Sequence, residues 1–243
     1  MTATDPRIAA LYDGDNPDGP DHDHWRRLVA ARQPRAIADL GCGTGMLTVT
    51  LAAPTRTVVG IDPDSGMLDI ARNRPGSQLV TWILGDANKI CPESAEVVLM
   101  TGNVAQHIGP RQWQQALIDI ATGLRAGGVL SFESRNPDVR AWNDWANDKS
   151  RGTRATPYGP LTEWMDVSAP DEHGTVLLTA HNLWEQTGED LIIEQPLTFR
   201  SSEQITDDLQ AAGLVVTEVV GDWGRGRFTE RSTVTVLQAE RRR

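Results

Sequence analysis

The sequence predicts an α/β fold with a mostly parallel seven-stranded sheet and an antiparallel β insertion after the fifth strand. Between residues 36 and 136, short apolar runs alternate with helix-compatible stretches, which is the pattern of βαβ units. Beyond residue 160, strand-like runs follow one another without helices between them, which is typical of antiparallel strands. A length of 243 residues suits one domain that carries such an insertion.

The core elements are expected in the following order. Strand-like runs occupy residues 36–40, 57–62, 78–84, 97–101 and 129–134, and helices are expected over 45–52, 65–74 and 110–124. In the last helix, Trp113, Leu117 and Ile120 recur at spacings of three and four, so one face is apolar. Right-handed crossovers place the loops after these strands at the carboxyl edge of the sheet, where ligands of open α/β folds bind.

The insertion is expected over residues 138–200, and the core over 1–137 and 201–243. Residues 138–160 are rich in polar residues, proline and glycine, which predicts a loop-rich excursion. Strand-like runs follow at 162–167, 175–186 and 189–200, with a hairpin turn at Thr187 and Gly188. A helix capped by Ser201 or Ser202 and closing strands at 214–223 and 233–240 complete the chain.

Composition narrows the classes of function. The chain has 23 Lys and Arg residues against 33 Asp and Glu, a net charge of -10, which opposes tight binding of nucleic acid. No apolar run approaches the roughly 18 to 20 residues that cross a bilayer, so no membrane partner is expected. Cys42 and Cys91 do not make the disulfide framework of a small secreted domain. We therefore expect a cytoplasmic protein.

The strongest local signal is the run D-L-G-C-G-T-G at residues 39–45, between a strand and a helix-compatible stretch. Its glycines let the backbone turn sharply and approach a ligand closely. A dinucleotide fingerprint needs G-x-G-x-x-G/A, but here the third glycine comes one residue early, which disfavours an NAD-dependent oxidoreductase. Asp62 closes the second strand about twenty residues beyond the first glycine, where an acid binds ribose hydroxyls in nucleotide-binding folds.

This run resembles motif I of the class I S-adenosylmethionine (SAM)-dependent methyltransferases. The resemblance covers about residues 36–136, with weaker support from 198–240, and it implies a doubly wound sheet with an antiparallel last strand. It implies SAM as the cofactor, with Asp39, Gly41, Gly43 and Gly45 on the methionine side, Asp62 at the ribose, Asp86 and Ala87 at adenine, and Thr101 beside the methionine moiety. Tyr12 is expected to cover the cofactor, where its ring would attract the sulfonium, and an ordinary packing role is the alternative.

The resemblance implies methyl transfer to an O, N or C atom of a small molecule by in-line displacement, yielding S-adenosylhomocysteine (SAH). The sulfonium already activates the methyl group, so the protein mainly aligns and desolvates the reactants. His107 is the candidate base, because its loop would face the substrate and its ordinary pKa is near neutrality, although a structural role is the alternative. Candidate acceptor contacts are Glu133, Arg135, Asn136, Trp164 and Trp184, although a place in the insertion's own core is the alternative for the two tryptophans. The insertion would cap this site.

The residues raise three further interpretations. The cluster at 21–24, D-H-D-H, invites a metal site, but no matching ligand set is evident, so a solvated segment without metal is expected. Residues 101–104 do not match the Asn/Asp-Pro-Pro-aromatic motif of methyltransferases that act on amino groups of DNA bases. A SAM-binding regulatory or scaffold protein without turnover is the alternative to an enzyme. These motifs specify neither the acceptor molecule nor the oligomeric state.

Overall fold

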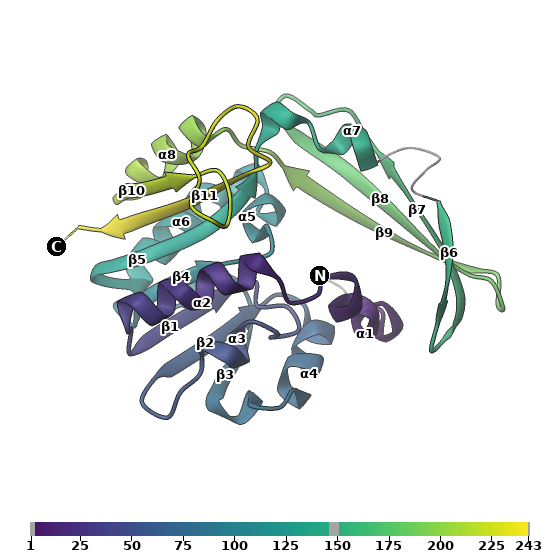
Figure 1. Ribbon diagram of the computed structural model, residues 1–243, viewed down its shortest axis with the longest axis horizontal. Coiled ribbons are helices and arrows are strands. Elements are labelled where there is room, and N and C mark those ends of the chain that lie inside the picture. Colours follow the sequence, from purple (N-terminus) through teal and green to yellow (C-terminus); the bar gives the residue numbers. More distant parts are fainter. Residues whose placement is uncertain (1–2, 146–150, 243) are drawn as a thin grey trace.

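The computed structural model describes residues 3–145 and 151–242 and contains two β-sheets (Figure 1). The larger sheet has seven strands in the order β10-β11-β5-β4-β1-β2-β3. Strands β1 to β5 pair in parallel, and β11 runs antiparallel to both β5 and β10. The predicted doubly wound fold with an antiparallel last strand is therefore confirmed.

The elements of the larger sheet and its surroundings have these bounds. The strands are β1 (Ala36–Leu40), β2 (Thr57–Asp62), β3 (Val80–Leu84), β4 (Ala95–Met100), β5 (Leu124–Arg135), β10 (Leu214–Val220) and β11 (Val234–Arg241). The helices are α1 (Pro6–Asp15), α2 (Pro20–Arg32), α3 (Thr48–Leu51), α4 (Ser65–Asn73), α5 (Val104–His107), α6 (Pro110–Gly123) and α8 (Ser202–Ala211), with short 3-10 turns η1 (Ser77–Leu79) and η2 (Ala87–Lys89).

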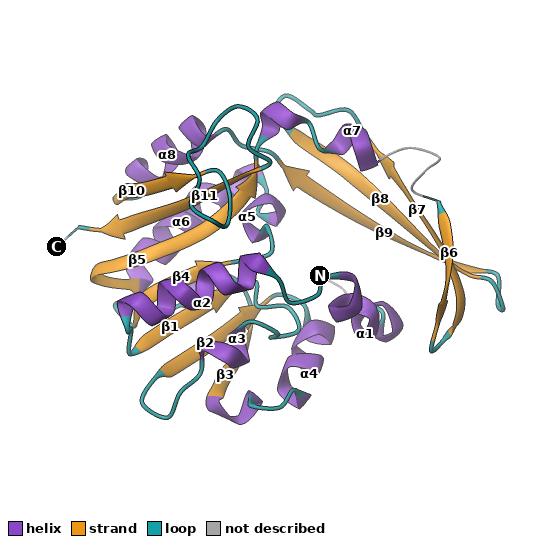
Figure 2. Cartoon of the chain, in the orientation of Figure 1, coloured by secondary structure: helices purple, strands orange, loops and turns teal. Residues whose placement is uncertain are grey.

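Helices cover both faces of this sheet (Figure 2). On one face, Trp25 and Leu28 of α2 pack with Leu51 of α3 against strand residues that include Ile37 and Leu99. On the other face, α6 and α8 pack against the opposite side chains of the same strands, in a cluster that contains Trp113, Leu117, Ile205, Leu209, Leu130 and Phe132. Because β1 is buried along its whole length, it forms the centre of the core.

Several expected bounds are corrected by the structure. The strand expected at 78–84 begins at Val80, after η1, and the helix expected over 45–52 is α3 alone, because Gly45 has a positive φ of 73°. Leu124 belongs to β5 rather than to the preceding helix, since it pairs with Ala95. Helices α1 and α2 were not expected, because their apolar residues do not recur at a clear helical spacing.

The second sheet lies between β5 and α8 in the sequence and is antiparallel, in the order β6-β7-β8-β9. Its strands are β6 (Gly152–Thr156), β7 (Gly159–Val167), β8 (Thr175–Trp184) and β9 (Glu189–Thr198), preceded by η3 (Pro137–Val139) and α7 (Trp142–Trp145). The stretch 138–160 is therefore more regular than the loop-rich excursion expected, although residues 146–150 lie outside the described part. The expected hairpin turn is confirmed, since the Gly188 amide donates to the Trp184 carbonyl at 2.8 Å.

Helix α1 lies between the larger sheet and this smaller sheet (Figure 1). Arg7 of α1 pairs with Glu189 of β9 at 2.8 Å, and Asp15 pairs with Arg154 of β6 at 2.6 Å. Helix α1 also contacts α4 of the core. The amino-terminal helix thus connects the two sheets beside the carboxyl ends of β1 and β2. Within the described ranges, none of the helices has the length and apolar character to cross a membrane.

Candidate functional site at the carboxyl edge of the larger sheet

The loop after β1 bends toward β2 at the predicted glycine run. The backbone amides of Gly41 and Cys42 both donate to the carbonyl of Ile61, at 2.7 and 3.1 Å. Gly41, Gly43 and Gly45 all have positive φ angles, of 74°, 53° and 73°, a region that favours glycine. The alternation of glycines therefore produces the tight turn that the sequence predicts.

The three glycines have different surroundings. A Cβ on Gly41 would lie 2.2 Å from the Val104 side chain, and one on Gly45 would lie 2.5 Å from the Trp82 ring. A Cβ on Gly43 would meet nothing within 4 Å. Gly41 and Gly45 are therefore packing positions, and Gly43 is the one of the three whose backbone faces open space. The motif alone did not separate these roles.

Asp62 at the end of β2 lies directly beside Gly43. Its Oδ2 accepts a hydrogen bond from the Gly43 amide at 2.8 Å, and its Oδ1 accepts one from the Asp64 amide at 2.8 Å. The carboxylate is only 7% exposed, and burial raises its pKa, although the two amides oppose that shift. Each carboxylate oxygen has a second lone pair, so both can still accept from a ligand hydroxyl.

The other predicted acids of the edge differ in their surroundings. Asp39 is buried, its Oδ2 accepts from the Thr48 hydroxyl at 2.6 Å, and its Oδ1 has no partner. Burial raises the pKa of Asp39 to about 6. Asp86 is exposed and accepts from the Asn88 amide at 3.1 Å, while Ala87 is buried. Their turn lies next to Asp62, since the Gly85 amide donates to the Asp62 carbonyl at 2.9 Å.

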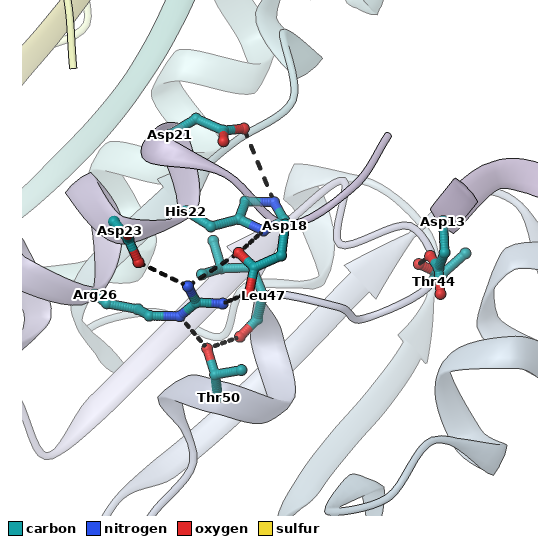
Figure 3. A network of polar contacts seen from close by, with 9 residues as sticks. All are labelled: Asp13, Asp18, Asp21, His22, Asp23, Arg26, Thr44, Leu47 and Thr50. Carbon is teal, nitrogen blue, oxygen red and sulfur yellow. Dashed lines mark hydrogen bonds and ion pairs between the residues drawn. The ribbon is translucent and has the colours of Figure 1, made fainter. Parts of the chain in front are cut away.

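Tyr12 and Asp13 on α1 lie over this edge. The Thr44 hydroxyl donates to Asp13 at 2.6 Å (Figure 3). Asp13 also pairs with Arg74. Burial raises the pKa of Tyr12, and the carboxylates of Asp62, Asp13 and Glu133 add to that shift. The Tyr12 hydroxyl is therefore affected both by Asp62 at the end of β2 and by Glu133 on β5. Neither Asp13 nor Arg74 was anticipated, because their contacts with the loop cross 31 and 30 residues of sequence.

A second attachment holds the far end of the glycine loop (Figure 3). Arg26 of α2 pairs with Asp18 and Asp23, and it donates to the Thr50 hydroxyl at 3.1 Å. The Thr50 hydroxyl in turn donates to the Leu47 carbonyl at 2.6 Å. The loop is thus held by α1 at Thr44 and by α2 beyond its last glycine.

The carboxyl ends of β4 and β5 hold a second polar group. Thr101 directly follows β4 and is buried, and Asn103 has a positive φ of 62°. The Asn103 amide donates to Oε1 of Glu133, which is 1% exposed, while Oε2 has no partner. Burial raises the pKa of Glu133 to about 7, against the lowering effect of the Asn103 amide. Asn103 was not singled out from the sequence, because isolated asparagines in loops carry no distinctive spacing.

Arg135 and His107 lie beside this group. Arg135 donates to Oε1 of the fully buried Gln106 at 2.9 Å, and its guanidinium lies 5.1 Å from the centre of the Trp145 ring. His107 ends α5 and has an exposed face. Burial of the rest of the ring lowers its pKa, and the charge of Arg135 lowers it further. Both residues therefore lie where the sequence placed the acceptor side of the site.

Asn136 differs from the expectation for an acceptor contact. Its side-chain amide donates to the carbonyls of Glu230 and Ser232, at 3.2 and 2.9 Å, and its Oδ1 accepts from the Asp138 amide at 3.1 Å. The side chain is 1% exposed. Asn136 thus connects the β10–β11 loop to the end of β5, and its hydrogen-bonding groups are already engaged.

Trp164 and Trp184 project from opposite faces of the smaller sheet. Trp184 pairs with Leu161, three residues from Trp164, and successive side chains alternate between faces. Trp184 is buried beneath the guanidinium of Arg7, on the face that contacts α1. Trp164 stacks on His181 with 4.4 Å between ring centres. The expectation that both line one substrate site is therefore corrected, since only Trp184 lies on the face toward α1.

The acidic and histidine cluster at 21–24 does not converge. His22 hydrogen-bonds with Asp18 at 3.0 Å, whereas His24 is buried beside Trp25 and faces the carbonyl of Trp223 at 3.3 Å. The solvated interpretation was wrong for His24, which belongs to the contact between α2 and the β10–β11 loop. Among the residues with described positions, no group of three or more metal-ligating side chains is present.

The chemistry of this edge fits SAM. Open space faces the Gly43 backbone, Asp62 can accept hydrogen bonds from ribose hydroxyls, and the partnerless Oδ1 of Asp39 can accept one more donor. Carboxylates also favour a cationic sulfonium over an anionic ligand. The site residues that the sequence predicts at β1, β2 and β3 thus lie together on neighbouring strands.

Comparison with known proteins supports the same family. Residues 37–128 match the family model described as "Methyltransferase domain". The chain is 31% identical over 154 residues to the malonyl-[acyl-carrier protein] O-methyltransferase of Halalkalibacterium halodurans, and the match covers 55% of this chain and 54% of that protein. The chain therefore spans about half the length of this curated relative. It is 27% identical to the cypemycin N-terminal methyltransferase of a Streptomyces species, over 88% of this chain and 87% of that protein.

Solved structures share the whole architecture. The CcbJ methyltransferase from Streptomyces caelestis superposes with a TM-score of 0.76 and 22% identity, over 100% of this chain and 99% of that chain. This likeness extends to the smaller sheet, because it covers the full chain. The glycine run, the sheet order and the comparisons agree, and residues 37–128 of the chain carry a methyltransferase domain.

Proposed function

We propose that this protein transfers the methyl group of SAM to an O, N or C atom of a small-molecule acceptor. One observation carries the proposal: the Gly43 amide and the Asp62 carboxylate are joined by a 2.8 Å hydrogen bond at the carboxyl edge of the sheet. A glycine turn and an acid on the neighbouring strand thus lie close enough to bind one adenosyl ligand. Curated relatives that carry methyltransferase names add to this support.

The cofactor would lie across the carboxyl ends of β1, β2 and β3. In this proposal Asp62 accepts from the ribose hydroxyls, Asp86 and the Ala87 amide contact adenine, and Asp39 and Gly43 lie beside the methionine moiety. Tyr12 and Thr101 would enclose the same moiety. When bound, SAM supplies a methyl group activated by its sulfonium. Gly41 and Gly45 would contribute by shaping the turn, because their own surroundings are filled by side chains.

The rest of the chain would hold the acceptor and exclude water. Glu133, Arg135, His107 and Trp184 are the proposed acceptor-side residues. Glu133 and Arg135 lie near the end of β5, His107 ends α5, and Trp184 lies on the face of the smaller sheet toward α1. Residues 138–200 would act as a cap over the core formed by 1–137 and 201–243, with α1 as the connection between them. A covered site of this kind suits a small acceptor. The cytoplasmic location inferred from the sequence stays a prediction.

Calorimetry with SAM and SAH tests the cofactor site. Asp62→Ala should weaken binding at least tenfold, because hydrogen bonds to a charged group contribute about 1.5–3 kcal/mol each. Asp207→Ala, an exposed acid on α8, is the matched control and should bind as wild type does. Equal affinity in the wild type and in Asp62→Ala would contradict the ribose assignment.

Turnover tests the reaction. Methyl-labelled SAM should transfer its label to some member of a panel of amines, alcohols and carbon acids, detected by mass spectrometry. Tight cofactor binding without transfer to any of them would favour the regulatory or scaffold alternative.

A further inference from the structure

Three buried polar atoms without partners occur in one connected group at the ends of β4 and β5. They are Oε2 of Glu133, Oδ1 of Asn103 and Nε2 of Gln106. The Asn103 backbone amide donates to the other oxygen of Glu133. The Gln106 backbone amide donates to the Asn103 backbone carbonyl at 3.0 Å. Buried polar atoms are nearly always satisfied in folded proteins, so this group indicates a place for a ligand.

The orientation of Gln106 is set by its neighbour. Arg135 can only donate, and it donates to Oε1 of Gln106 at 2.9 Å, so the partnerless atom of Gln106 is a donor. The open atom of Asn103 is Oδ1, which can only accept, and Oε2 of Glu133 accepts when the carboxyl is ionised. A single ligand that satisfied all three atoms would offer at least two N–H or O–H donors and one acceptor atom.

The number of hydrogen-bond donors distinguishes amines, alcohols and carbon nucleophiles as methyl acceptors. A protonated primary amine carries three N–H donors on one nitrogen and a protonated secondary amine carries two, enough for both oxygens. An alcohol carries one O–H donor, which would leave one buried oxygen unsatisfied, and a carbon nucleophile carries none. An amine must also lose a proton before its nitrogen can attack, and a carboxylate within hydrogen-bond reach is a suitable base.

Charges of both signs act on Glu133. The charge of Asp21 on α2 raises the pKa of Glu133, whereas the charge of Arg135, which lies on β5 like Glu133, lowers it. The Glu133 carboxylate in turn raises the pKa of Tyr12 on α1. Arg135 is already engaged by Gln106 and the Trp145 ring. Burial raises the pKa of Glu133 to about 7, so near neutrality the carboxyl can exist in either form and exchange a proton with an amine.

We propose that Glu133 and Asn103 bind the acceptor as a protonated amine and that Glu133 removes its proton. This inference rests on the proposed function and narrows it to N-methylation. The proton passes from nitrogen to Oε2 of Glu133, which leaves a lone pair on nitrogen. The nitrogen then forms a bond to the methyl carbon while the carbon–sulfur bond breaks and its electron pair goes to sulfur. The products are a methylated ammonium ion and SAH, and the Glu133 proton is released to solvent.

The unpartnered Nε2 of Gln106 adds a further contact to the proposed acceptor. Its Nε2 would meet an oxygen or other acceptor atom close to the amine of the same molecule. The acceptor class is therefore an amine with a neighbouring hydroxyl, ether or carbonyl oxygen.

A carboxyl titration tests the amine site without knowledge of the natural acceptor. In protein labelled with carbon-13 at glutamate carboxyls and saturated with SAH, the Glu133 signal is assigned by its loss in Glu133→Gln. Methylammonium chloride should lower the pKa of Glu133 relative to sodium chloride at equal ionic strength, and methanol should not. The same titration curve in methylammonium and sodium chloride would overturn the proposal.

Asn103→Gly provides a second test that preserves the backbone. Glycine accepts the positive φ of 62° at this position, and the backbone amide that donates to Glu133 remains. Removal of the side chain, and with it Oδ1, should reduce the effect of methylammonium on the Glu133 titration. In turnover of a methylated amine it should raise KM more than it lowers kcat. An unchanged methylammonium effect and KM would remove Asn103 from the site.

Cofactor binding and turnover separate the possible failures. Glu133→Gln should bind SAH as wild type does and should lower kcat/KM for amines roughly 100-fold with loss of the acidic limb of the pH profile. The exposed Glu194→Gln is the matched control. Loss of SAH binding in Glu133→Gln would assign Glu133 to the cofactor and overturn the amine site. Transfer to alcohols but not to their amine counterparts would also overturn it, whereas absence of SAH binding in the wild type would overturn the proposed function itself.

Discussion

The indole ring of Trp82 on β3 occupies the space in which Gly45 would carry a Cβ, with 2.5 Å between that position and the nearest ring atom. The same ring lies 2.6 Å from the Cβ position of Gly60 on β2. Trp82 therefore fixes the end of the glycine loop against the neighbouring strand. Gly43, two residues before Gly45, is left facing open space, so one motif combines a packing role with a ligand-facing role.

Substitution of the two glycines should separate these roles. Gly45→Ala should lower the free energy of unfolding by about 2–5 kcal/mol, because a left-handed alanine costs about 1–2 kcal/mol and the clash with Trp82 adds about 1–3. Gly43→Ala should cost only the conformational part, about 1–2 kcal/mol, but should weaken SAH binding. Urea denaturation and calorimetry measure the two effects. Equal losses of stability in the two variants would contradict the assignment.

The local part of the site could be predicted from sequence, and the contacts that cover it could not. Strand, glycine turn and the acid at Asp62 follow one another within about thirty residues, so their spacing alone indicates a nucleotide-binding edge. The contact of Asp13 with Thr44 joins segments 31 residues apart, and α1 lacks a clear apolar periodicity. Strand patterns likewise predicted the smaller sheet, but the opposite orientations of Trp164 and Trp184 require the register of β7 and β8.

The buried Asp39 should make stability depend on pH. Its pKa is raised from 3.8 to about 6, so the folded protein binds a proton more tightly than the unfolded chain does. The contribution is most favourable below about pH 4 and is lost as the pH rises from 4 to 6, a change of about 3 kcal/mol at 1.36 kcal/mol per pKa unit. Asp39→Asn should therefore gain stability relative to wild type as the pH rises through this range. Chemical denaturation of both proteins at several pH values measures this difference, and parallel curves would contradict the buried-acid explanation.

Asn136 should contribute to stability rather than to acceptor binding. Asn136→Ala removes two hydrogen bonds to the β10–β11 loop and leaves the carbonyls of Glu230 and Ser232 without that donor. We expect a loss of about 1–3 kcal/mol in the free energy of unfolding. SAH affinity and the KM of a methylated acceptor should stay within twofold of wild type. A raised KM with unchanged stability would restore Asn136 to the acceptor site.

The ion pairs of α1 should control how often the site opens. Arg154 joins Asp15 of α1 to the smaller sheet at 2.6 Å, and exposed pairs of this kind contribute about 0.2–1 kcal/mol. Arg154→Ala should therefore leave global stability nearly unchanged while amides of residues 6–15 exchange with deuterium up to about fivefold faster. SAH should restore part of the protection, because a ligand beneath Tyr12 would stabilise the covered state. Arg125→Ala is the control. It breaks a comparable exposed pair with Glu96, at 3.0 Å, near the amino ends of β4 and β5, whereas α1 lies at the carboxyl edge of the sheet. If Arg125→Ala and Arg154→Ala changed exchange of residues 6–15 equally, the connection between α1 and the smaller sheet would not hold the site closed.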